Sequence, residues 1–253
     1  GIAIGRISLV CSNSFDSIIL SALFGLTITA IYSNYYFVFS SISGFMGILV
    51  TSMSASVGNS LVTESIEKNE TDHRKFDLYY EIIVGFCVIC LFSLYQSFMR
   101  VWVGEDLMLS NVSMILFCAY FYIHHLAQIR SVYSEAAGLW WYFKYLSIAE
   151  MMGNILLNIF LGKLMGVNGI LIATIITAFL CSFIGCTIIT YKRLFKKSPR
   201  TYFLNNALYF AIAICGCLLI NLVGNMIYVD NWASLFIKAI ICAFLGMLYL
   251  IGI

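Results

Sequence analysis

The sequence predicts an all-α fold, a polytopic membrane bundle of about eight transmembrane helices. Two observations carry this prediction. Of the 253 residues, 62% are apolar and only 10% are charged, whereas a soluble domain carries about 25% charged residues. The apolar runs extend over about 20 residues or more without strict alternation, which is typical of membrane-spanning helices and not of a β-barrel.

The hydropathy pattern places the eight spans in order at roughly 3–24, 27–60, 77–101, 107–131, 142–164, 166–191, 201–223 and 232–253. Gly25 and Leu26 form the short connection between the first two spans. The second span makes about 50 Å of helix, which exceeds a hydrocarbon core of about 30 Å. The only proline, Pro199, lies elsewhere, so we expect the second span to bend at Gly44 and Gly47.

The basic residues predict the orientation. If the N-terminus is cytoplasmic, only Arg100, Lys163 and Lys238 lie on the outer side. The inner side then holds Arg6, Lys68, Arg74, Lys75, Arg130, Lys144, Lys192, Arg193, Lys196, Lys197 and Arg200. This asymmetry follows the positive-inside rule. The basic stretch 191–200 lies on the same side, and we expect it to attract anionic lipid headgroups and not nucleic acid.

Polar side chains recur inside the apolar spans, where a charged group costs about 2.5–3.5 kcal/mol at mid-bilayer. In the first span, Arg6, Asn13 and Asp16 share one arc with several serines. We expect this polar face to lie against a hydrated cavity or neighbouring helices and not against lipid. Helical spacing predicts two further polar columns, Ser147, Glu150, Asn154 and Asn158 in the fifth span and Tyr120, His124, Gln128 and Ser131 in the fourth.

Several classes of site are absent from the sequence pattern. No phosphate-binding loop or nucleophile motif occurs, so we expect neither an enzyme nor a bound cofactor. The nine cysteines lie in apolar runs, and the adjacent His124 and His125 diverge around the helix, which predicts no disulfide framework and no metal site. The charged stretch 63–77 is interpreted as a solvated linker.

Particular strings resemble a known family. The run from Asp16 through Gly25 to the cluster Tyr32–Tyr35, followed by "SVGN" at 56–59, resembles the Wzx-type polysaccharide flippases of the multidrug/oligosaccharidyl-lipid/polysaccharide exporter superfamily. The strings "AAGLWW" (136–141) and "GVNGILIATII" (166–176) resemble the same family. The resemblance covers most of residues 10–195.

The resemblance implies a two-lobed transporter. Residues 1–191 would form its six-helix second lobe and residues 192–253 two additional helices. We expect the chain to be a fragment that lacks the first lobe. The implied function is the flipping of undecaprenyl-diphosphate-linked oligosaccharides across the bacterial cytoplasmic membrane by alternating access, for O-antigen or capsule synthesis. Other polysaccharide-assembly membrane proteins would be partners.

Site roles follow from this expectation. Asp16 and Glu150 are candidates for binding a coupling proton or sodium ion, because burial favours the neutral form of a carboxyl group. Arg6 is the candidate contact for the diphosphate. The candidate sugar contacts are Asn13, Tyr32, Asn34, Tyr35, Tyr36, Asn154 and Asn158.

Structural hydrogen bonding between helices is the competing interpretation for each of these residues. Two other functions stay open. One is an ion-coupled multidrug exporter of the same superfamily, which neighbouring glycosyltransferase genes would argue against. The other is a structural or truncated subunit without transport activity.

Overall fold

The computed structural model describes the backbone of residues 2–252 and the side chains of residues 16–252. Within these bounds the chain is helical almost throughout and has no β-strand, which confirms the all-α prediction. Seven helical stretches are long and apolar enough to cross a membrane. The first of them consists of two segments joined at a kink, in agreement with the eight spans predicted.

The first helix, α1 (Ile2–Thr63), turns sharply at Gly25, where φ is 79° and ψ is 173°. This backbone conformation is essentially restricted to glycine, because a Cβ atom would clash with the backbone. Gly44 and Gly47 instead keep helical backbone angles, so no kink occurs where the sequence predicted a bend. The fold therefore reverses direction at one glycine, and the segment after it continues as one long helix.

The second helix, α2 (Ile66–Val103), begins earlier than predicted. Ser65 caps it by accepting a hydrogen bond from the Lys68 backbone nitrogen at 3.2 Å. The interpretation of 63–77 as a solvated linker is therefore wrong. Glu70, His73 and Asp77 lie on one face of α2 and are buried. The charge content of this stretch indicated a solvent-exposed segment. The spacing of these residues by three and four positions, however, places them together on a helix face that other helices cover.

The elements after α2 follow in chain order: η1 (Glu105–Leu107), α3 (Asn111–His125), α4 (Gln128–Ala136), α5 (Trp140–Met165), α6 (Val167–Thr177), η2 (Ala178–Gly185), α7 (Cys186–Thr190), η3 (Tyr191–Phe195), α8 (Arg200–Gly224) and α9 (Trp232–Ile251). The stretch from α6 to η3 runs as one rod with π-helical segments at η2 and η3. The predicted fourth span is broken at Leu126 and Ala127, between α3 and α4.

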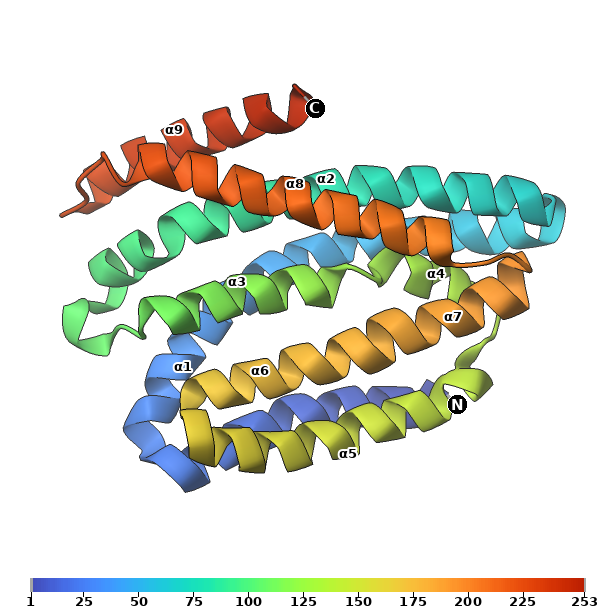
Figure 1. Ribbon diagram of the computed structural model, residues 1–253, viewed down its shortest axis with the longest axis horizontal. Helices are drawn as coiled ribbons and strands as arrows, with labels where there is room; N and C mark the ends of the chain where they lie inside the picture. The colour runs from blue at the N-terminus through green and yellow to red at the C-terminus, as the bar shows by residue number, and fades with distance from the viewer. Residues whose placement is uncertain (1, 253) are drawn as a thin grey trace.

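The helices form two packed groups (Figure 1). The helix α1 packs with α5 and α6, while α2 packs with α8 and α9, and α3 lies between them in contact with both α2 and α6. The connections alternate between two ends of the bundle, as expected for a chain that crosses a membrane repeatedly. The end with the α1–α2, α4–α5 and α7–α8 connections is called the α1–α2 end below.

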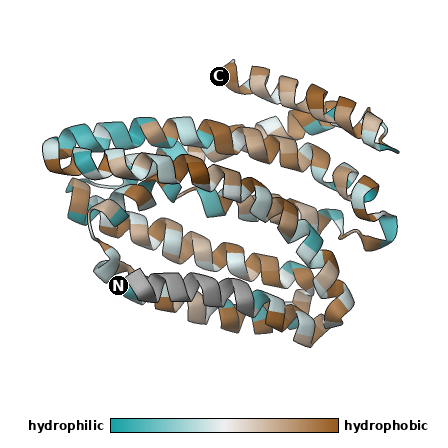
Figure 2. Cartoon of the chain, turned by 180° about the vertical axis from the view of Figure 1, so that it is seen from behind, coloured by the Kyte–Doolittle hydropathy of each residue, from teal (hydrophilic) through white to brown (hydrophobic). Residues whose placement is uncertain are grey.

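Close packing joins the two C-terminal helices to the rest. A Cβ atom on Gly216 of α8 would lie 2.5 Å from Ile89 of α2 and 2.7 Å from Tyr249 of α9. Large apolar side chains such as Phe37, Leu156 and Phe236 cover the outside. Hydrophilic residues gather at the α1–α2 end, mainly on the first turns of α2 (Figure 2). An apolar belt with a polar end is the surface that a membrane protein requires.

Candidate functional site

A polar cavity of about 360 Å³ lies among α1, α3, α4, α5 and the rod from α6 to α7. Its lining residues come from all of these helices, and five of them are acidic residues, arginine or histidine. These five are Asp16, His124, Arg130, Glu135 and Glu150. Their helices are otherwise apolar enough to cross a membrane, so the cavity gathers groups that hydrocarbon would not solvate.

A ring of hydrogen bonds closes the deep part of this cavity. Asn158 Nδ2 donates to Asp16 Oδ1 at 2.5 Å and to Asn154 Oδ1 at 3.0 Å. Asn154 Nδ2 donates to Thr174 Oγ1 at 3.1 Å, and Thr174 Oγ1 lies 3.4 Å from Asp16 Oδ2. Three helices, α1, α5 and α6, thus hold one carboxyl group in a closed polar circuit.

Local sequence explains how this ring assembles. Asn154 and Asn158 are four residues apart on α5, so their side chains lie on one helix face. One turn beyond Asn158, Gly162 allows the three helices to approach, because a Cβ atom there would lie 3.2 Å from Leu23 and 3.5 Å from Ile170. The sequence identified the asparagines and the aspartate separately. It offered no signal that Thr174, on another helix, completes the ring.

Arg130 is a buried cavity residue that the sequence did not single out as a candidate site residue. It is 2% exposed and lines the cavity, although the sequence counted it only as a charge on the inner side. Its Nη2 donates to Ser131 Oγ and to the Ser182 carbonyl oxygen, both at 3.2 Å. Its guanidinium carbon lies 5.7 Å from the centre of the Phe143 ring, and its Nε has no hydrogen-bond partner. A buried guanidinium that retains an unused donor is suited to bind an anionic group.

Glu150 lines the same cavity on α5, one turn before Asn154. Both carboxyl groups assigned to ion coupling therefore face one space. Their transport roles stay predictions, since the geometry gives their positions and not their function. Glu150 is not part of the ring around Asp16. Among the described side chains, no hydrogen bond joins Glu150 to Asp16.

The predicted sugar contacts separate into distinct groups. Tyr36 lines the cavity, as does Asn154, while Asn158 is buried in the ring. Tyr32 and Tyr35 do not line the cavity but pack against Phe117. Asn34 is half-buried and lies outside the cavity lining. The side chains of Arg6 and Asn13 lie outside the described residues.

Tyr35 has a specific packing role. Its hydroxyl donates to Gln96 Oε1 at 2.6 Å and accepts from the Leu109 backbone nitrogen at 3.1 Å. These bonds join α1 to α2 and to the connection before α3. The buried hydroxyl thus donates to one partner and accepts from another within the protein. The assignment of Tyr35 as a sugar contact stays a prediction.

The polar column of the fourth span is largely present. Tyr120, His124 and Ser131 line the cavity, whereas Gln128 donates to the His124 carbonyl oxygen at 3.1 Å. His125 does not line the cavity; Ser43 Oγ, which does, lies 3.1 Å from its Nε2, and Tyr80 Oη lies 2.8 Å from its Nδ1. Among the described side chains, no cluster of three or more His, Cys, Asp and Glu residues could hold a metal ion.

Part of the basic stretch 191–200 packs against the protein. Lys197 Nζ lies 3.0 Å from Glu70 Oε2, and the Arg193 guanidinium lies 4.4 Å from the centre of the Tyr142 ring. Tyr191 and Phe195 are buried. The groups still directed toward the surroundings are those of Lys192, Lys196 and Arg200, which are exposed.

The chain matches no protein-family model, no curated protein and no solved structure. The established description is therefore that of a multi-pass helical membrane protein. The resemblance to the flippases stays a prediction from the sequence strings.

Proposed function

We propose that this chain forms part of the substrate pathway of a membrane transporter that flips undecaprenyl-diphosphate-linked oligosaccharides. The observation that carries the proposal is the polar cavity of about 360 Å³ inside an apolar bundle. Ionisable groups inside a membrane protein are costly and typically mark a substrate or ion pathway. A lipid-linked oligosaccharide needs such a path for its headgroup, while its isoprenoid tail stays in hydrocarbon.

The lining residues supply the chemistry that this headgroup requires. Arg130 provides a positive charge and an unused donor for a phosphate oxygen. Tyr36, Ser40 and Asn154 present hydroxyl and amide groups toward sugar hydroxyls. Arg130 is thus a candidate diphosphate contact among the described residues, in addition to Arg6, whose side chain lies outside them.

We assign ion coupling to Asp16 and Glu150. In the ring around Asp16 the amide nitrogens of Asn154 and Asn158 donate inward, so the ring as it stands suits a proton. A sodium ion would require these amides to present their oxygens, which are the ligands that hard cations prefer. In one conformation, a proton on Asp16 or a sodium ion within the ring would compensate the negative charge of the carboxyl group. Movement of α5 relative to α1 would break the bond from Asn158 and release the ion, which is the behaviour that alternating access requires.

We propose two further contacts of this transporter. The exposed Lys192, Lys196 and Arg200 would bind anionic lipid at the membrane surface. The N-terminus of the chain would then be cytoplasmic, in a bacterial inner membrane. Membrane proteins of polysaccharide assembly would be its partners.

The test replaces single residues in the complete gene product, in a strain whose own flippase is deleted. D16N, E150Q and R130Q should each reduce surface polysaccharide at least tenfold at unchanged protein level. E64Q, at an exposed position outside the cavity, is the matched control and should export normally. Undiminished export by all three cavity variants would contradict the proposal. Altered drug resistance with normal polysaccharide would favour the multidrug exporter.

A further inference from the structure

A second group of buried acids lies on α2, outside the polar cavity. Asp77 and Glu81 are one helical turn apart and only 3% and 4% exposed. Asp77 accepts hydrogen bonds from Tyr202 Oη and Asn206 Nδ2, each at 3.3 Å. Neither carboxyl oxygen of Glu81 has a hydrogen-bond partner within the described part of the chain. Two acids thus share one buried site, and among the described residues only Asp77 accepts hydrogen bonds of normal geometry.

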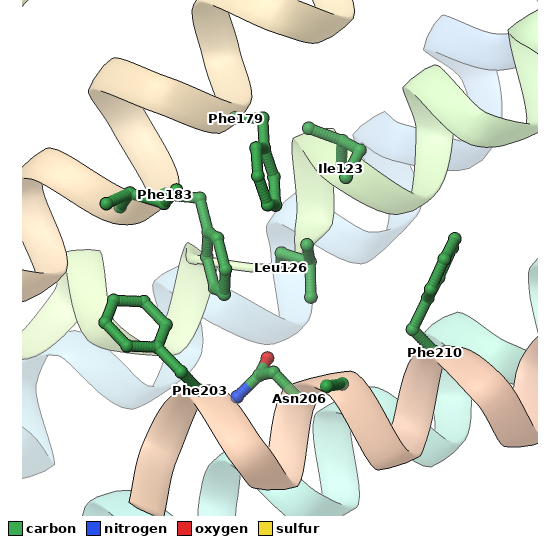
Figure 3. Close-up of a pocket in the computed structure, with 9 residues that line it drawn as sticks. Ile123, Leu126, Phe179, Phe183, Phe203, Asn206 and Phe210 are labelled. Atoms are coloured by element: carbon green, nitrogen blue, oxygen red, sulfur yellow. The ribbon is translucent and has the colours of Figure 1, made fainter. Parts of the chain in front are cut away.

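Unpartnered polar atoms around the pair point to a ligand. The hydroxyl of Tyr122, on α3, lies beside Glu81 within reach of its carboxyl group and makes no other hydrogen bond. Asn206, on α8, is 2% exposed, and its Oδ1 also has no partner. Figure 3 shows the Asn206 amide between Phe203 and Phe210, beneath Leu126, in an apolar pocket of about 370 Å³. Buried polar atoms without partners are rare in folded proteins.

The charges at this site do not balance. The guanidinium of Arg130 acts electrostatically on Asp77, which leaves the second carboxylate without a countercharge. His73 packs against the Tyr202 ring at a tilted angle, and neither of its nitrogens makes a hydrogen bond. A buried, unpaired carboxylate is energetically costly, so the site calls for one additional positive charge.

Glu70, one turn before His73 on the same helix, provides the contrast. It is equally buried, but it forms ion pairs with both Arg74 and Lys197. Two basic side chains thus pair with the buried carboxylate of Glu70. Among the described residues, no basic side chain forms an ion pair with Glu81.

We infer that Asp77 and Glu81 form a proton-binding site in which Glu81 carries one proton beside Tyr122. A proton fits the site better than a metal cation does. The amide of Asn206 directs its nitrogen, not its oxygen, toward Asp77, and a nitrogen donor cannot be part of an oxygen cage. A protonated Glu81 can donate to the Tyr122 oxygen, which satisfies two orphan groups with one bond.

The site is connected to the polar cavity through α4 and Tyr202. Arg130 lines the cavity and also acts on Asp77. Tyr202 Oη lies 3.1 Å from the Leu126 carbonyl oxygen, at the break between α3 and α4, in addition to its contact with Asp77. A phenol has one proton, so these two acceptors compete for it. Loss of the proton from Glu81 would add negative charge to the pair and draw Arg130 and Tyr202 toward it.

Groups from α2, α3, α4, η3 and α8 act on this pair, and none of them besides Arg130 is basic. They are Tyr80 on α2, Tyr122 on α3, Arg130 on α4, Tyr191 on η3, and Tyr202 and Tyr209 on α8. The inference goes beyond the proposed function, because it holds whatever substrate the cavity takes.

Infrared spectroscopy of the purified full chain in lipid tests the inference. At neutral pH the spectrum should contain the C=O stretch of a protonated carboxyl group, shifted in D₂O. E81Q should remove the Glu81 component of this band, whereas E67Q, at an exposed position on the same helix, should leave it unchanged. Identical carboxyl bands in E81Q and the unmodified protein would overturn the proposal.

Two further measurements keep the test decisive. If E81Q does not fold, Y122F removes only the hydroxyl beside Glu81 and should shift the frequency of the same band; an unshifted band would overturn the proposal. Sodium chloride is also compared with choline chloride at equal ionic strength. Loss of the band with sodium, together with a thermal midpoint raised by sodium only when Glu81 is present, would show a cation site instead.

Discussion

Asn158 donates a hydrogen bond at 2.5 Å to the carboxyl group of Asp16, across 142 positions of the sequence. The bond joins α5 to α1 in the interior of the bundle, and both side chains are buried. Asn158 also contacts Asn154, so a single amide connects the carboxyl group to the rest of the ring. This amide therefore has a structural role that is testable apart from any transport.

N158A should lower the thermal midpoint of the purified protein. The substitution removes a hydrogen bond to a buried carboxyl group, a loss of about 1.5–3 kcal/mol when that group is charged. Thermal unfolding in detergent measures the effect. S17A, at an exposed neighbour of Asp16, serves as the control and should unfold like the unmodified protein. Equal midpoints for N158A and S17A would show that the bond contributes nothing.

Y35F should reduce stability without a separate effect on transport. The phenol oxygen joins Gln96 to the Leu109 backbone, and its loss leaves both groups without this partner. We expect a cost of about 1–3 kcal/mol. Y36F changes a side chain that lines the cavity instead. If Y35F unfolded normally but exported less polysaccharide per molecule, the sugar-contact role would be correct after all.

G25A should destabilise the fold by about 1–3 kcal/mol, because φ of 79° with ψ of 173° is a glycine-specific conformation. G44A is the matched control on the same helix. Gly44 is helical and a Cβ atom there meets nothing within 4 Å, so alanine should be neutral or stabilising. Thermal midpoints of the two variants decide the point. A G25A protein as stable as G44A would contradict the kink.

G216V should separate the C-terminal helices from α2. A side chain at this position would overlap Ile89 and Tyr249, so the three helices must move apart at a cost of about 1–3 kcal/mol. C215L enlarges the next residue, which is exposed, and should be tolerated. Limited proteolysis and thermal unfolding report the change. Unaltered stability of G216V would indicate that α8 and α9 pack independently of residues 1–191.

A cysteine at Ser147 should react with a charged, membrane-impermeant maleimide from the cytoplasmic side. Ser147 lines the cavity together with Glu135 and Trp140, near the α4–α5 connection that belongs to the α1–α2 end. The background is a variant whose nine cysteines are replaced. L156C, on the lipid-facing surface, should not react from either side. Labelling of S147C only from the outer side would reverse the predicted orientation.

Several features followed from the sequence because they depend on single segments. A helix in lipid satisfies its own backbone hydrogen bonds, so length and apolarity suffice to predict the spans. Gly25 marked the turn by its place between two apolar runs. The spacing of Glu150, Asn154 and Asn158 placed them on one face of α5, where the structure has Glu150 and Asn154 in the cavity lining and Asn158 in the ring beside it.

What only the tertiary structure decided is how these faces meet. The rotation of each helix about its axis depends on packing with neighbours that are distant in sequence. That rotation joined Thr174 to Asp16, placed Arg130 in the cavity, and directed Tyr35 toward Gln96 and not toward the cavity. It also buried Asp77, which the charge pattern had assigned to a solvated linker, and Glu81, which lies one turn beyond that linker. Hydropathy predicts that a helix exists, but contacts between helices determine which of its polar groups share a site.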